Sequence, residues 1–311
     1  MTIPLLQLCP LLPALQRELE SRYEVLRAFD DPAREAVAAA RGGELRAVVT
    51  GGHVGIPSAL LQRLPALQLV AINGVGYDKV DLELARSRGV RVTNTPDVLT
   101  DDVADLAVGL VIALLRRIPQ GDAHVRAGRW PSGELPLARK VSSQRFGIFG
   151  LGRIGNAIAR RLQGFGVAIA YAGRAPQAVP YRYVETLAQL AAESDVLIIA
   201  AAAGPSTRGI VGRDILERLG PRGALVNVAR GSIVDEDELV AALSDGRLGG
   251  AALDVFANEP DVPAALRALP NVVMTPHVAS ATTETREAMA ALVLRNLEAH
   301  FAGLPLPTPV V

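Results

Sequence analysis

The stretch Gly147–Gly155, GIFGLGRIG, decides the fold of the chain. A short apolar run typical of a buried strand leads into three glycines with the spacing G-x-G-x-x-G, namely Gly150, Gly152 and Gly155. The first glycine permits a tight turn, the second lets the backbone approach a pyrophosphate, and the third lets the next helix pack closely on the sheet. A helical pattern and a second apolar run follow, so the stretch predicts a dinucleotide-binding unit rather than a structural glycine turn.

The start of the helix after this turn is the expected phosphate site. The first backbone N–H groups of a helix have no partner inside the helix, and they attract anions. We therefore expect Leu151, Arg153 and Ile154 to contact the cofactor together with the three glycines.

The next strand predicts which dinucleotide is bound. Its sequence, VAIAYAGR, ends in Gly173 and Arg174, without the carboxylate that would hold the ribose hydroxyls of NAD. An arginine at this place pairs well with the 2′-phosphate of NADP. We predict NADP (NADPH) as the cofactor, the alternative being that Arg174 is an ordinary loop residue.

The glycine turn lies near the middle of the 311-residue chain, which predicts a separate domain before it. Apolar runs alternate with helical patterns up to residue 93 and again from residue 146 to residue 275. Such alternation predicts parallel sheets flanked by helices. The segment between the two arrays, 99–127, predicts one long helix or a pair, and a closing helix is predicted at about 284–301.

Composition excludes several classes of function. The chain has 32 acidic and 32 basic residues and an aromatic content of 4%, so we expect no nucleic-acid partner. No uninterrupted apolar run approaches the roughly 20 residues of a membrane span. Cys9 is the only cysteine, which excludes an intrachain disulfide and suits a cytoplasmic protein. We expect no metal site.

Three polar residues follow predicted strands of the second array. Arg230 comes after GALVNVA, Glu259 after AALDVFAN and His277 after NVVMTP. In an open α/β sheet, ligands bind outside the carboxyl ends of the strands. Each residue alone is ordinary, but together they form an anion binder, an orienting carboxylate and an acid–base group. This set suits the reduction of a 2-oxo acid.

The order and spacing of six motifs resemble the D-2-hydroxyacid dehydrogenase family. These motifs are NGVGYDKVDL, GVRVTNTPDVLTDDVADLAVGL, GIFGLGRIG, VNVARGSIVDEDEL, GRLGGAALDVFANEP and NVVMTPHVAS. Within the family the chain is similar to the NADPH-dependent glyoxylate/hydroxypyruvate reductases and the plant hydroxyphenylpyruvate reductases. The resemblance implies an α/β fold of two Rossmann-like parallel-sheet domains. The dinucleotide-binding domain, 99–283, is inserted into a discontinuous substrate domain, 1–98 and 284–311.

The resemblance also implies roles for further residues. On the substrate side, the Val75–Gly76 backbone binds the substrate carboxylate, His53 lines the pocket, and Trp130 reaches the pocket of the partner in a homodimer built around region 99–129. The cofactor contacts implied are Val103, Thr207, Val228, Ala229 and Asp254, with Asp254 on the nicotinamide carboxamide. Thr207 lies in AAAGPSTRGIV, which departs from the usual family wording.

These expectations combine into a mechanism. Arg230 holds the carboxylate of glyoxylate, hydroxypyruvate or another small 2-oxo acid, His277 acts as the general acid, and Glu259 orients the imidazole. The product is the D-2-hydroxy acid. Two alternatives stay open, an NAD-linked D-2-hydroxyacid dehydrogenase of other substrate range and a dinucleotide-sensing, corepressor-like scaffold, since such scaffolds can retain the same three residues.

Overall fold

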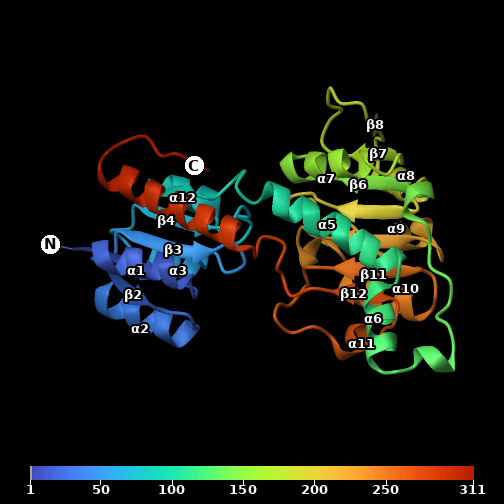
Figure 1. Ribbon diagram of the computed structural model, residues 1–311. Coiled ribbons are helices and arrows are strands. Elements are labelled where there is room, and N and C mark those ends of the chain that lie inside the picture. The colour runs from blue at the N-terminus through green and yellow to red at the C-terminus, as the bar shows by residue number, and fades with distance from the viewer. Residues whose placement is uncertain (1) are drawn as a thin grey trace. The chain divides into compact units, whose positions relative to one another are not determined.

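The computed structural model describes residues 2–311, which divide into two compact units (Figure 1). Unit 1 consists of the residues up to Leu99 together with Ala281–Val311, and unit 2 consists of Thr100–Ser280. Each unit is a parallel sheet with helices on both faces. The predicted fold class, two Rossmann-like parallel-sheet domains with one inserted into the other, is confirmed.

Unit 1 contains a five-stranded sheet of order β2-β1-β3-β4-β5. Its elements are β1 (Ile3–Gln7), α1 (Pro13–Arg22), β2 (Tyr23–Arg27), α2 (Asp31–Arg41), β3 (Ala47–Gly51), α3 (Ser58–Gln62), β4 (Leu69–Asn73), α4 (Leu82–Ser87), β5 (Arg91–Thr93) and α12 (Thr283–Phe301). Helices α1 and α12 pack on one face of this sheet, and α2, α3 and α4 pack on the other.

Both faces of the unit 1 sheet are buried. Leu5 and Val49 point to the α12 face, whereas their chain neighbours Leu6 and Val48 point to the opposite face. Successive side chains of a strand alternate between the two faces, so a strand covered on both sides is apolar throughout. This explains why the sequence shows continuous apolar runs in place of an alternating pattern.

Unit 2 contains a seven-stranded sheet of order β12-β11-β10-β9-β6-β7-β8. Its α-helices and strands are α5 (Thr100–Leu115), α6 (Ile118–Arg126), β6 (Arg145–Phe149), α7 (Arg153–Gln163), β7 (Ala168–Ala172), β8 (Arg182–Tyr183), α8 (Leu187–Ala192), β9 (Val196–Ile199), α9 (Arg213–Leu219), β10 (Ala224–Asn227), α10 (Glu236–Ser244), β11 (Gly250–Leu253), α11 (Ala264–Arg267) and β12 (Val272–Met274). Helices α5 and α7 lie on one face, with α8, α9 and α10 on the other (Figure 1).

The long apolar segment after Leu99 forms two helices, α5 and α6. The buried residues of α5, which include Val103, Ala107 and Val111, pack against α7 and the strands β10–β12 of unit 2. The resemblance implied a homodimer built around region 99–129, but much of the apolar surface of α5 is buried within unit 2. Exposed large apolar side chains are found further along the chain, in the segment 118–137.

Polar side chains begin several helices. Asp30, Asp81 and Asp235 each accept a hydrogen bond from the backbone N–H of the third residue of α2, α4 and α10, at 2.8, 2.9 and 3.2 Å. Thr186 and Thr282 do the same for α8 and α12, at 3.1 and 3.2 Å. Such caps satisfy backbone N–H groups that the helix itself cannot bond.

Within residues 2–311, none of the helices combines the length and the apolar character needed to cross a membrane.

Candidate functional site: a glycine turn and a histidine–glutamate pair

The glycine turn follows β6 at the place where the chain changes direction across the sheet. Strand β6 lies between β7 and β9, so the next strands along the chain are added on opposite sides of it. This arrangement is the topological switch point at which open α/β sheets bind ligands. The turn therefore opens onto the carboxyl edge of the unit 2 sheet.

The three glycines of the turn have different surroundings. Gly150 has φ +94°, and a Cβ there would collide with the backbone of Ala201. A Cβ on Gly155 would collide with the carbonyl oxygen of Gly150, which locks the start of α7 against the turn. A Cβ on Gly152 would meet no protein atom within 4 Å. The side-chain space at Gly152 is thus open for a ligand, as the sequence predicts for a pyrophosphate site.

The loop after β7 lies beside this turn. Gln177 Nε2 donates a hydrogen bond to the carbonyl oxygen of Leu151 at 2.9 Å, which ties the loop to the turn. Gly173 has open space around its Cα. Arg174 is exposed, and within the described residues 2–311 its guanidinium makes no hydrogen bond or ion pair. The cation is therefore available to an anionic group.

The loops after β10, β11 and β12 bring together the three residues predicted to do the chemistry. His277 Nδ1 lies 2.6 Å from Glu259 Oε2, and both side chains are partly exposed, at 34% and 26%. Glu259 Oε1 accepts the backbone N–H of Phe256 at 3.0 Å, which fixes the carboxylate. Arg230 Nη1 donates to the Ala229 carbonyl oxygen at 2.7 Å.

The charges of this cluster act on one another. Burial disfavours the ionised form of Glu259, but the hydrogen bonds from His277 and the Phe256 N–H, with the positive charges of His277 and Arg230, outweigh it. The net result is that the pKa of Glu259 is lowered from its ordinary value. A carboxylate that stays ionised can hold the imidazole of His277 in one orientation.

Val103, Thr207, Val228, Ala229 and Asp254 also lie in unit 2. Val103 and Val228 are buried, and Thr207 Oγ1 donates to the Ala202 carbonyl oxygen at 3.0 Å. Ala229 N donates to Asn227 Oδ1 at 3.1 Å. Asp254 is fully buried, and its carboxylate accepts hydrogen bonds from the segment 275–279. Contact of its side chain with a carboxamide therefore stays a prediction, beside a structural role that the sequence did not reveal.

Unit 1 places its predicted substrate residues at the carboxyl edge of its own sheet. A Cβ on Gly74 would lie 3.2 Å from the backbone nitrogen of Gly52, so the loops after β3 and β4 lie side by side. Val75 accepts a hydrogen bond from Asn94 Nδ2 at 2.8 Å. His53 and Gly76 lie in the same pair of loops, with His53 exposed.

Trp130 lies outside both of these groups. It begins a short 3₁₀ helix in unit 2, and 67% of its surface is exposed.

Sequence reasoning missed two polar residues that support the site. Asn227, the last residue of β10, bonds the Ala229 N–H and, through Nδ2, the Arg230 carbonyl oxygen at 2.9 Å. Thr275 follows β12 and donates its hydroxyl to Asp254 Oδ1 at 2.6 Å. The available indication was a polar residue ending an otherwise apolar strand, in ALVN and VVMT.

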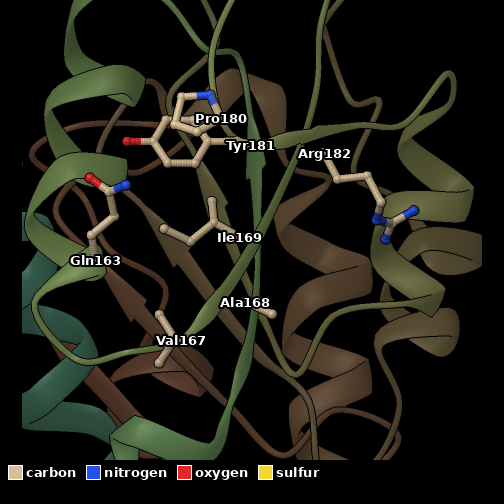
Figure 2. Close-up of a pocket in the computed structure, with 7 residues that line it drawn as sticks. All are labelled: Gln163, Val167, Ala168, Ile169, Pro180, Tyr181 and Arg182. Carbon is tan, nitrogen blue, oxygen red and sulfur yellow. The ribbon is translucent and has the colours of Figure 1, made fainter.

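One cavity, of about 420 Å³, lies away from the carboxyl edge. It is lined by Gln163, Val167, Ala168, Ile169, Pro180, Tyr181 and Arg182. Figure 2 shows Ile169, Gln163 and Tyr181 on one side of β7 and Arg182 pointing to the other side. Because Ala168 is the first residue of β7, this cavity belongs to the amino-terminal end of the strand, and it has no share in the cluster around His277.

Comparison with known proteins agrees with this geometry. Residues 108–279 match the family model described as D-isomer specific 2-hydroxyacid dehydrogenase, NAD binding domain. The chain is 49% identical to hydroxyphenylpyruvate reductase of Plectranthus scutellarioides, over 99% of both chains. It is also 49% identical to a glyoxylate/hydroxypyruvate reductase of Arabidopsis thaliana, over 100% of this chain and 99% of the relative.

Among solved structures, the chain is similar to an NADPH-dependent glyoxylate/hydroxypyruvate reductase from Sinorhizobium meliloti in complex with NADP and malonate. The TM-score is 0.93 at 44% identity, with 100% of this chain and 97% of that chain covered. The family model covers more than half of the sequence, and the relatives extend over nearly all of it. The chain therefore belongs to the D-isomer-specific 2-hydroxyacid dehydrogenase family.

Proposed function

We propose that the protein catalyses the NADPH-dependent reduction of a small 2-oxo acid, glyoxylate or hydroxypyruvate, to the D-2-hydroxy acid. The observation that carries the proposal is the 2.6 Å pair of His277 and Glu259, with Arg230 acting on the same carboxylate, at the sheet edge that also carries the glycine turn. The name of the Arabidopsis thaliana relative supports glyoxylate and hydroxypyruvate as substrates, and the name of the Plectranthus scutellarioides relative supports the wider class of 2-oxo acids.

The residues around the glycine turn fit a dinucleotide. Gly150, Gly152 and Gly155, with Leu151, Arg153 and Ile154, would hold the pyrophosphate, since Gly152 leaves room for it and the start of a helix such as α7 attracts anions. Gly173 and Arg174 would hold the 2′-phosphate, which needs space and a cation. Bound there, the reduced nicotinamide supplies the hydride.

The remaining cofactor contacts are proposed as the sequence analysis gave them. Val103, Thr207, Val228, Ala229 and Asp254 would line the nicotinamide half of the cofactor.

The side chains at this edge would handle the carboxylate and the proton. Arg230 would bind the substrate carboxylate through its planar guanidinium and polarise the neighbouring carbonyl group. Because Nδ1 of His277 bonds to Glu259, proton transfer to the new alkoxide falls to Nε2. Glu259 would keep the ring oriented and stabilise its protonated form until the proton leaves.

We propose that unit 1 binds the substrate and that unit 2 binds the dinucleotide. The predicted limits are 1–98 and 284–311 for the substrate domain and 99–283 for the dinucleotide-binding domain. Val75, Gly76 and His53 are the unit 1 residues proposed to face the substrate. The side-by-side arrangement of their two loops supports this assignment.

The test is NADPH oxidation, followed by absorbance, across 2-oxo acids of rising size: glyoxylate, hydroxypyruvate and 4-hydroxyphenylpyruvate. We expect the two smaller acids to give the higher kcat/KM, with a product of the D configuration. Failure of every acid to oxidise NADPH above the rate of a Glu259→Gln, His277→Ala double variant would refute the proposal and favour a dinucleotide-sensing scaffold.

We also propose a homodimer, with Trp130 contributing to the partner's substrate pocket. Within segment 118–137 four large apolar side chains are strongly exposed: Ile118 at 51%, Val125 at 57%, Trp130 at 67% and Leu137 at 95%. Exposed apolar surface of this kind is typical of a protein interface.

Sedimentation velocity at micromolar concentration tests the dimer. We expect the native chain to sediment as a dimer and the double variant Val125→Glu, Leu137→Glu to sediment as a monomer. A native monomer would contradict the proposal. We also propose a cytoplasmic location, supported by the single, buried Cys9, and cell fractionation would check it.

A further inference from the structure

The backbone conformation at His277 is unusual and must be held in place by its neighbours. His277 has φ +53°, in the left-handed region that residues other than glycine rarely occupy. Such a conformation persists only where the surrounding structure strongly determines it. Its backbone N–H is bonded to two carbonyl oxygens, those of Asp254 at 2.8 Å and Thr275 at 3.1 Å.

Thr275 uses all of its polar groups to fix this segment. Its N–H donates to the carbonyl oxygen of Leu253 at 2.9 Å, and its own carbonyl oxygen accepts from His277. Its hydroxyl donates to Asp254 Oδ1 at 2.6 Å. The residue therefore joins the end of β11 to the histidine two positions along the chain.

Asp254 completes the arrangement on the other side of His277. Its Oδ1 also accepts the N–H of Val278 at 2.9 Å, and its Oδ2 accepts the N–H of Ala279 at 3.0 Å. Asp254 is fully buried, so water is not available to replace a lost hydrogen bond. Removing the Thr275 hydroxyl would leave Oδ1 with one donor and free the chain on the N-terminal side of His277.

We propose that Thr275 is a positioning residue, whose hydroxyl acts through Asp254 to hold His277 where it can bond Glu259 and transfer a proton. The inference rests on the proposed role of His277 as general acid. A misplacement of about 1 Å at a reacting group can cost on the order of 100-fold in rate, so loss of one such anchor has a measurable effect.

The decisive comparison is between three variants. Thr275→Val keeps the shape of the side chain and removes the hydroxyl, and Thr275→Ser restores the hydroxyl. Ser194→Ala is the control, because the hydroxyl of Ser194, a buried residue of unit 2, also donates a hydrogen bond at 2.6 Å, to the Leu190 carbonyl oxygen. Ser194 precedes β9 at the amino edge of the sheet, away from His277.

For Thr275→Val we expect kcat with hydroxypyruvate to fall by about 10- to 100-fold. NADPH affinity should change by less than about twofold, since the Asp254 carboxylate keeps its two backbone donors. Thr275→Ser should recover most of kcat. Ser194→Ala should also lower Tm, although by less than Thr275→Val, because its hydroxyl donates to a neutral carbonyl oxygen and not to a carboxylate. It should leave kcat within about twofold of the native value, because Ser194 lies away from His277.

A second measurement does not depend on turnover. The chain has four histidines, so the ring ¹⁵N and ¹H signals of His277 can be assigned by comparison with a His277→Gln variant. In the native protein and in Thr275→Ser we expect a slowly exchanging Nδ1 proton bonded to Glu259, and in Thr275→Val we expect that signal to broaden or disappear. Thr275→Ala gives the same comparison if the valine variant does not fold.

The outcomes separate the two proposals. If the native protein reduces no 2-oxo acid, the proposed function fails, while the ring signal still decides whether Thr275 holds His277. A native-like kcat and ring signal in Thr275→Val would overturn the inference. So would a loss of kcat that Thr275→Ser does not repair, or one that Ser194→Ala reproduces.

Discussion

In both sheets the order in which strands are added reverses beside the first strand, but the loops that follow that strand differ. In unit 1 the chain passes from β1 to β2 on one side and β3 on the other, and in unit 2 it passes from β6 to β7 and then β9. After β6 comes the glycine turn, with open space at Gly152. After β1 comes LCPLLP, which has no glycine.

In unit 1 the corresponding place is filled by side chains. A Cβ on Gly51, at the end of β3, would lie 2.7 Å from His53 Cε1 and 3.4 Å from Cys9 Sγ. Cys9 is 3% exposed. A dinucleotide needs free backbone N–H groups and an uncovered turn at this position. The difference teaches that the shared fold supplies an edge for binding, and that a few residues decide what the edge binds.

The same contrast holds for the chemistry of the two edges. Unit 2 carries Arg230, Glu259 and His277 after consecutive strands, whereas the unit 1 loops offer mainly backbone groups around Gly74–Gly76 and one histidine, His53. We therefore expect changes in unit 2 to affect the rate of the reaction and changes in unit 1 to affect substrate affinity.

The largest expected effect comes from exchanging the two histidines for alanine, one at a time. His277→Ala removes the proposed general acid and should lower kcat by about 10²–10⁴-fold, with NADPH binding retained. His53→Ala removes part of a pocket wall and should raise KM with kcat within about tenfold. Steady-state kinetics on both variants measures the contrast. Equal losses of kcat would mean that the chemistry is shared between the two edges.

The glycine turn gives the next effect in size. Gly152→Ala should fold as the native protein does, since a Cβ there meets no protein atom, but it should weaken NADPH binding by about tenfold or more because the methyl group occupies the pyrophosphate position. Gly43→Ala in unit 1 is the matched control, since a Cβ there also meets nothing within 4 Å. Fluorescence titration with NADPH and thermal unfolding are the measurements. Similar NADPH affinity in both variants would place the pyrophosphate elsewhere.

Much of this contrast was predictable from the sequence because it depends on local patterns. The run GIFGLGRIG contains the strand, the turn and the helix start in one stretch, and the paired strands are continuous apolar runs. The strands lie in the two arrays of apolar runs predicted up to residue 93 and from about residue 146 to residue 275, and segment 99–127 forms the pair of helices allowed for. Because these patterns are local, the sequence was enough to predict the fold class and the family, and both predictions were confirmed.

Other features depend on contacts that no local pattern reveals. Strand β8 has two residues and exists because it pairs with β7. The burial of α5 on its own sheet required knowledge of which helices face one another. The hydrogen bonds of Asp254 to Thr275, Val278 and Ala279 join residues more than twenty positions apart, and only the paired strands bring them together.

Cofactor preference is a smaller effect, confined to the loop after β7. We expect the native protein to prefer NADPH over NADH by at least about tenfold, since one charge-assisted hydrogen bond from Arg174 is worth about 1.5–3 kcal/mol and tenfold needs about 1.4 kcal/mol. Gly173→Asp with Arg174→Ile should shift preference toward NADH by adding a ribose acceptor and removing the cation. The measurement is kcat/KM for both cofactors. An unchanged NADPH preference in the double variant would show that the 2′-phosphate is bound by other residues.

The smallest expected effect concerns Cys9, which fills the unit 1 counterpart of the glycine turn. Burial outweighs a hydrogen bond from the Gly51 backbone and the positive charge of Arg34, and it raises the pKa of the thiol from 9.0 to about 11. The folded protein thus favours the neutral thiol. We expect no alkylation of the native protein at pH 8, one reactive thiol after denaturation, and kinetics of Cys9→Ala close to native.

The raised pKa of Cys9 also predicts how stability depends on pH. Above pH 9 the thiol ionises in the unfolded chain but not in the folded one, so its contribution is fully present below about pH 9 and is lost as the pH rises toward about 11. Two pKa units limit the change to about 3 kcal/mol. Urea unfolding of the native protein and of Cys9→Ala between pH 8 and 11 isolates the contribution of the thiol to the unfolding free energy, because the other titrating groups are common to both. We expect the difference in unfolding free energy to fall with pH in favour of the alanine variant. A constant difference would mean that the thiol is hydrated in the folded state and that the unit 1 edge is as open as the glycine turn.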